Sequence, residues 1–138
     1  IHCGLVGSEM CIRDSNNLIA IVHKDSDFRD GKTFYTDNNK DFQFGTFKLE
    51  QGEIIENHIH NSQKREINKT SEAIVVIKGS LKIMLFDNEK NFIDAVIINT
   101  NDAILLFEGG HGIEVIEGSK FIEFKQGPYT EDMDKKHF

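Results

Sequence analysis

The sequence predicts an all-β domain, a sandwich or barrel built from short strands. Segments of strand length, rich in β-branched and aromatic residues, recur at short intervals from Leu18 to Lys125. Turn-forming residues separate these segments, and none of them carries the apolar stripe of an amphipathic helix. Many short strands with regularly spaced turns are typical of sandwiches and barrels.

Nine segments are expected to be strands. In chain order they are Leu18–His23, Phe42–Leu49, Glu53–His60, Ala73–Lys78, Leu81–Phe86, Phe92–Ile98, Ala103–Phe107, Gly112–Ile116 and Phe121–Lys125. Gly79-Ser80 leaves two residues between two of these segments, which is the spacing of a tight hairpin. The polar stretches 87–91, 99–102 and 117–120 are expected to be further turns. Alternating Phe42, Phe44 and Phe47 are expected in the core, with a role in lining a cavity as the alternative.

Length and charge limit the possible function classes. At 138 residues the chain forms one domain, which can bury about two-thirds of its unfolded surface. A net charge of −7 disfavours nucleic acid and anionic membranes as partners. The longest apolar runs, 73–77 and 103–107, are far shorter than the ~20 residues that span a bilayer. We therefore expect a protein that binds neither nucleic acid nor membrane.

The first fifteen residues differ in character from the rest of the chain. They begin at Ile1 and lack the basic flank and apolar core of a secretory signal. The string from Cys3 to Ser15 resembles the peptide translated from a sequencing adapter at the ends of metagenomic reading frames. We therefore expect 1–15 to be a non-native leader, with a genuine mobile terminus as the alternative, and 16–138 to be one domain that folds without it. Both cysteines lie in the leader, so the domain offers no thiol ligand, and we expect it in the cytoplasm.

Four residues suited to binding a metal ion stand at ordered spacings. In an extended strand His58 and His60 would project to the same side, about 7 Å apart. Such a pair alone often arises by chance, but Glu72 and His111 complete a plausible shell of three imidazoles and one carboxylate. This set suits Mn, Fe, Co, Ni or Zn and leaves coordination positions open for a substrate. The full pattern is Gly52-x5-His58-x-His60-x11-Glu72-x6-Gly79, followed by His111 within Gly109-Gly110-His111-Gly112.

These residues resemble the two motifs of the cupin superfamily. The first motif is matched with a gap of eleven residues before Glu72, longer than the usual few. In the second motif His111 fits the fourth ligand, whereas Asn101-Asp102 stands where Gly-Asp is usual and Leu106 where proline is usual. Asn tolerates the left-handed dihedral angles that such a turn requires.

A narrower resemblance covers about residues 18 to 138. The run GGHGIEVIEGSKFIEFKQGPY, with Asp134-Lys135 and Phe138 after it, is similar to small cupins of bacterial surface-polysaccharide gene clusters. The resemblance implies a double-stranded β-helix, a cupin-like jelly-roll barrel that holds one divalent metal and opens to substrate at one end. It also implies a homodimer and a small-molecule substrate, a sugar or a nucleotide sugar.

An open metal site of this kind permits more than one chemistry. Chelation of a hydroxy-ketone would assist proton removal beside the carbonyl, so we expect a sugar isomerase or epimerase. A dioxygenase on the same metal and a non-catalytic carbohydrate-binding module are the alternatives. A metal-free ketoisomerase, with His58 and His60 transferring the proton, is a further one.

An isomerase also needs a general base. Glu66 is a candidate because it lies in the polar segment 61–71 expected at the barrel mouth, and Tyr129 is a second candidate. Lys64, Arg65 and Lys69 of the same segment form a basic patch that is either solvated or binds a phosphate.

Overall fold

The fold is all-β, as the sequence predicts. The computed structural model describes residues 10–138, and in this part the only helical element is the 3₁₀ turn η1 (Asp25–Asp27). None of the described residues belongs to a helix long and apolar enough to cross a membrane. The strands are β1 (Met10–Asp14), β2 (Asn17–His23), β3 (Gly31–Phe34), β4 (Gly45–Lys48), β5 (Glu72–Phe86), β6 (Phe92–Asn99), β7 (Ala103–Leu106) and β8 (Gly110–Lys125).

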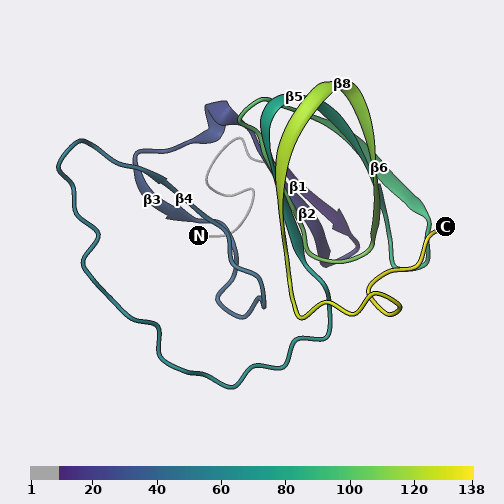
Figure 1. Cartoon of the computed structure of the whole chain (residues 1–138), viewed down its shortest axis with the longest axis horizontal. Helices are drawn as coiled ribbons and strands as arrows, with labels where there is room; N and C mark the ends of the chain where they lie inside the picture. Colours follow the sequence, from purple (N-terminus) through teal and green to yellow (C-terminus); the bar gives the residue numbers. More distant parts are fainter. Residues whose placement is uncertain (1–9) are drawn as a thin grey trace.

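Six strands form one antiparallel sheet, and two form a separate ribbon. The path through the large sheet is β1-β2-β7-β5-β6, and β8 pairs with β5 outside this path. The first part of β5 lies between β7 and the end of β8, whereas its second part lies between β6 and the start of β8. The β3–β4 ribbon stands apart from the sheet (Figure 1).

The β5–β8 ribbon bends sharply in the middle. Ile74 and Val76 bury their side chains in the main core, and so do Leu81, Ile83 and Leu85 further along the same strand. Side chains alternate between the two faces of a strand, so this change from even to odd positions requires an irregularity between them. The pairing with β8 indeed shifts at three places between Val76 and Leu81. As a result, both halves of one strand cover the same core, and Figure 1 shows β5 and β8 arching together.

The predicted hairpin at Gly79-Ser80 is wrong, because this dipeptide is a corner within the single strand β5. Gly79 has φ +106°, and a Cβ there would collide with Ser119 and the carbonyl of Gly118. The predicted turn at 117–120 is the matching corner within β8. The two corners are joined by the backbone N–H of Ser80, which donates to Ser119 Oγ at 3.0 Å. The sequence predicts a bend correctly at both places, but only the strand pairing shows that β5 and β8 each continue through the bend.

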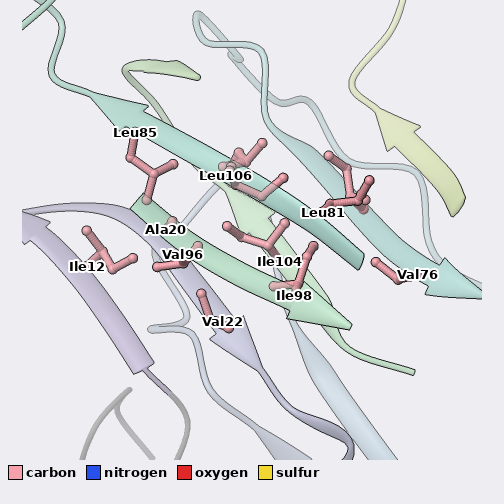
Figure 2. Packing of buried hydrophobic residues seen from close by; sticks show 12 residues of the cluster. Ile12, Ala20, Val22, Val76, Leu81, Leu85, Val96, Ile98, Ile104 and Leu106 are labelled. Atoms are coloured by element: carbon pink, nitrogen blue, oxygen red, sulfur yellow. The ribbon is translucent and has the colours of Figure 1, made fainter. Parts of the chain in front are cut away.

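Two hydrophobic clusters make up the core. The larger contains side chains from β1, β2, β5, β6 and β7, which converge in Figure 2. The smaller contains Tyr35 and Phe107, with Phe42 and Phe44 packed partly buried against it. Phe42 and Phe44 thus have the core role that their pattern predicts, whereas Phe47 is 44 % exposed.

The N-terminal boundary expected after residue 15 does not coincide with the edge of the sheet. Residues 10–14 form β1, which pairs with β2 from Met10 opposite Val22 to Asp14 opposite Asn17. Ile12 is 6 % exposed and belongs to the larger core cluster. Residues 10–14 therefore contribute to the described sheet, and folding of 16–138 without them stays a prediction. The edge of β2 that does not face β7 presents backbone N–H and C=O groups, and β1 pairs with them. The rest of the leader lies outside the described residues.

The strand expected at Glu53–His60 is absent. Residues 49–71 form no strand in the structure and run as a long irregular segment outside the β3–β4 ribbon (Figure 1). The pattern of isoleucines in this segment suits a strand, but a strand exists only when a neighbouring edge pairs with it. No described strand of the chain provides that edge here.

Candidate functional site

A cavity of about 930 Å³ lies between the bent β5–β8 ribbon and the C-terminal tail, residues 126–138. Its wall includes Glu72 and Phe86 from the two ends of β5, and His111 and Lys125 from the two ends of β8. The bend explains how these ends meet, because it folds the ribbon back on itself. The tail supplies a further part of the wall, from Asp134 to Phe138, and the turn after β5 supplies Asp87, Asn88 and Lys90.

Glu72 and His111 approach each other in this cavity. Glu72 Oε2 lies 2.9 Å from His111 Nε2, with 13 % of the Glu72 side chain and 29 % of the His111 side chain exposed. The distance is short, but the orientation is not that of a hydrogen bond, and Oε2 is buried without a hydrogen-bond donor among the described residues. The pair is therefore a close polar contact and not a hydrogen bond, because a hydrogen bond requires a favourable angle as well as a short distance. A buried carboxylate oxygen and a ring nitrogen thus converge on one point.

The charge state of Glu72 follows from its surroundings. Its contact with the His111 side chain lowers the pKa of the Glu72 carboxyl below the ordinary value of 4.5, and burial offsets part of this effect. The charges of His111 and Lys125 lower this pKa further, whereas Asp134 raises it. Glu72 is therefore a carboxylate at neutral pH, the form that binds cations and accepts protons.

Charged side chains of both signs surround the pair. Lys90, Lys125, Lys135 and Lys136 all line the cavity. Lys125 Nζ lies 3.2 Å from Asp134 Oδ2, and this contact raises the pKa of Lys125. The ion pair also fastens the C-terminal tail to the end of β8. The cavity wall therefore mixes four lysines with five carboxylates, which belong to Glu72, Asp87, Glu108, Glu123 and Asp134.

The last residue of the chain closes one side of the cavity. The Phe138 ring meets the Phe86 ring edge to face, with centroids 5.1 Å apart. Lys90 Nζ lies 5.8 Å from the centroid of Phe138. A Cβ on Gly110 would come within 2.8 Å of the Phe138 ring, so the glycine makes room for this contact.

The structure does not bring His58 and His60 to Glu72 and His111. Both histidines lie in the exposed segment between β4 and β5, with ring centroids 5.2 Å apart. The Nδ1 atom of His58 lies 2.8 Å from the carbonyl oxygen of Glu56. Within residues 10–138, no group of three or more His, Cys, Asp or Glu side chains is placed to hold a metal ion. The physical reason is the missing strand, because the two histidines would project to the same side only if their segment were an extended, paired strand. The four-ligand site stays a prediction.

The other sequence candidates lie outside the main cavity. Glu66 is exposed in the same segment as the histidines, and Tyr129 is 60 % exposed beside Lys125. Lys69 forms an ion pair with Glu108, which removes it from a free basic patch. Arg65 and Lys69 line a second, smaller cavity of about 360 Å³.

Sequence reasoning missed the cavity-lining role of Lys90, Lys125 and Glu123. Each lies in a segment expected to be an ordinary turn or strand, and no local pattern distinguishes a lysine that faces a cavity from one that faces solvent. Asp134 and Phe138 had a signal, because they belong to the resemblance at the C-terminus.

The fold and the site define a class: an all-β protein whose bent ribbon forms a cavity around a carboxylate and an imidazole. Comparison of the chain with protein-family models, with curated proteins and with solved structures finds no match.

Proposed function

We propose that the protein is a metal-binding cupin, a cytoplasmic jelly-roll barrel that isomerises or epimerises a sugar or nucleotide sugar for cell-surface polysaccharide synthesis. The observation that carries the proposal is the contact of Glu72 Oε2 with His111 Nε2, 2.9 Å apart in a cavity of about 930 Å³. Small-molecule sites are clefts of about 300 to 1,000 Å³ with a few converging polar groups. The antiparallel sheet that folds around one core is compatible with a jelly roll.

The residues of the cavity fit a divalent metal. A buried carboxylate oxygen without a hydrogen-bond donor would gain a partner from a cation, and the neighbouring ring nitrogen is a second donor atom. Glu72 and His111 would hold the ion, with His58 and His60 as the other two ligands. When bound, such a metal supplies Lewis-acid polarisation of the oxygens of a hydroxy-ketone.

The lysines of the cavity suit a nucleotide sugar. Lys90, Lys135 and Lys136 line it and would bind the phosphates, a role that the sequence suggested for Lys64, Arg65 and Lys69. Such contacts act on parts of the substrate that do not react. Neutralising Lys135 and Lys136 together should therefore raise KM more than it lowers kcat.

Proton removal needs a base that does not also hold the metal. Glu123 lines the same cavity and is not part of the Glu72–His111 contact, whereas Glu66 lies outside the cavity, so we assign this role to Glu123. The carbon-bound proton would move to the Glu123 carboxylate and return to the neighbouring carbon or to the opposite face. Glu114 lies on the same strand outside the cavity and provides a matched control.

Exchange of a carbon-bound proton with heavy water tests the function. The metal-loaded protein is incubated in heavy water with nucleoside-diphosphate sugars and with free keto-sugars, and deuterium incorporation is measured by mass spectrometry. We expect incorporation by the wild type and by Glu114→Gln, and at least a hundredfold loss in Glu123→Gln with metal content retained. Absence of exchange from every sugar overturns the isomerase. Consumption of oxygen by the iron form would then support the dioxygenase, and sugar binding without turnover the binding module.

A further inference from the structure

The segment that carries His58 and His60 buries almost nothing against its own chain. We call residues 50–70 the arm, and every residue of it is exposed. Three of its four isoleucines, Ile54, Ile55 and Ile59, are 84 %, 58 % and 88 % exposed, and the fourth, Ile67, is 36 % exposed. Apolar side chains gathered on an unpaired segment are typical of a surface that another chain covers.

The arm is fixed at both ends but free between them. At one end it continues from β4, and at the other Ser71 Oγ donates to the carbonyl of Phe107 at 3.2 Å. Among the described residues, no backbone hydrogen bond joins residues 54–68 to one another or to the rest of the chain. Apart from the carbonyl of Glu56, which contacts His58 Nδ1, the backbone N–H and C=O groups of this stretch are therefore available for strand pairing.

Strand β8 offers the complementary edge. Among the described strands it pairs with β5 alone, so one side of its sixteen residues presents backbone groups that no described strand pairs with. Apolar side chains of β8 are also left exposed, with Val115 at 56 %, Ile122 at 47 % and Phe124 at 56 %. A long, apolar, unpaired edge is the surface to which an extended segment adds as a further strand.

The four predicted metal ligands are divided between the arm and the β5–β8 ribbon. His58 and His60 lie on the arm, whereas His111 lies on β8 and Glu72 on the strand paired with it. A partner strand for the arm would also restore the extended geometry in which His58 and His60 project to the same side. A strand that pairs with the arm would therefore also give His58 and His60 the same-side geometry that the predicted metal site requires.

We propose that two copies of this chain exchange arms: the arm of each copy pairs with β8 of the other and brings His58 and His60 to its Glu72 and His111. Such an exchange is reciprocal and closes as a two-fold dimer with two identical sites. In Figure 1 the first part of the arm passes outside the β3–β4 ribbon, on the side away from β6 and β8 of its own chain, and the last part returns to β5. The contribution of the histidines rests on the proposed metal function, whereas the exchange itself does not.

Sedimentation tests the exchange without any metal. The full chain should sediment as a dimer, and the variant Ile54→Asp/Ile59→Asp should sediment as a monomer with unchanged circular dichroism. Ile97→Asp is the control, because Ile97 is 43 % exposed on β6, outside both the arm and β8. This control should remain a dimer. A monomeric wild type, or an arm variant that dimerises as well as the control, overturns the proposal.

Mixed variants test which copy supplies the histidines. His60→Ala and His111→Ala each break every site when purified alone. Unfolded together and refolded, they should regain about one metal site per four chains, because half of the dimers are mixed and each mixed dimer has one intact site. An arm that folded back onto its own chain would leave every site broken, so failure to regain metal while wild-type protein binds it overturns the exchange of histidines. A wild-type dimer that binds no metal overturns the metal function and leaves the exchange of arms supported by sedimentation.

Discussion

Glu72 and His111 lie in contact although neither is the other's partner in the β5–β8 pairing. Glu72 is paired with Lys125 and His111 with Leu85, at opposite ends of the ribbon. Their side chains approach to 2.9 Å because the ribbon bends between them. The site therefore depends on the corners as much as on the residues that form it.

The first prediction concerns this contact. His111→Ala removes one of the four proposed ligands and should sharply reduce metal occupancy, because a distant side chain cannot replace the lost bond. Glu72→Gln should lower the affinity for the metal ion, because it removes the negative charge of the carboxylate. Elemental analysis of purified protein measures both effects. His137→Ala is the control, since His137 also lines the cavity, and it should keep its metal. Equal occupancy in His111→Ala and His137→Ala would contradict the assignment.

The second prediction concerns the corner of β5. Gly79→Ala should destabilise the protein by about 1–3 kcal/mol, because the residue has positive φ and an added methyl group has no space beside Ser119. Denaturant unfolding measures the change. Gly118→Ala is the control, because a Cβ at Gly118 meets no atom within 4 Å. An equal loss in both variants would show that the close approach at Gly79 is unimportant.

The third prediction concerns Asp102, which is 5 % exposed. Its carboxylate accepts hydrogen bonds from the backbone N–H groups of Asp25 and Asn99 and from Lys24 Nζ. Asp102→Ala should cost about 1–3 kcal/mol of stability, because two partly buried N–H donors lose their acceptor. Thermal unfolding provides the measurement, and Asp94→Ala on the exposed face of β6 should have a much smaller effect. The reverse order of the two effects would contradict this account.

The fourth prediction concerns the N-terminal strand. Ile12→Ala should cost about 2–4 kcal/mol, because Ile12 is 6 % exposed in the main core cluster. Met10→Ala should cost much less, since Met10 is 44 % exposed on the same strand. Urea unfolding distinguishes the two variants. If Ile12→Ala is as stable as the wild type, residues 10–14 do not pack in solution and the shorter domain expected from the sequence is correct.

The fifth prediction concerns pH. Hydrogen bonds from Asn91 and Glu89 hold the pKa of Asp87 below its ordinary value of 3.8. A carboxyl with a lowered pKa in the folded state stabilises the fold above its unfolded pKa, and the stabilisation is lost as pH falls through the folded value. The difference in melting temperature between wild type and Asp87→Asn should therefore be constant near neutral pH and shrink below about pH 4. A difference that grows on acidification would show the opposite sign.

The turn at Asn101 shows how much local sequence can determine. Asn101 has φ +70°, in the left-handed region that asparagine was expected to tolerate in this turn. Its N–H donates to the carbonyl of Val76, which attaches the turn to β5. The conformation is local and readable from the sequence, whereas its attachment point is not.

The sequence by itself determined the all-β class, the positions of most strands and the positions of the bends, because these depend on side-chain shape and alternation within a few residues. It also singled out Glu72 and His111. Tertiary structure decided that Gly79-Ser80 is a corner instead of a hairpin turn, that Ile12 belongs to the core and that Lys90, Lys125 and Phe138 share a cavity. In the tertiary structure the segment with His58 and His60 also has no strand partner among the described residues. Each of these depends on which edges pair, and pairing between distant segments is set by the packing of the whole chain.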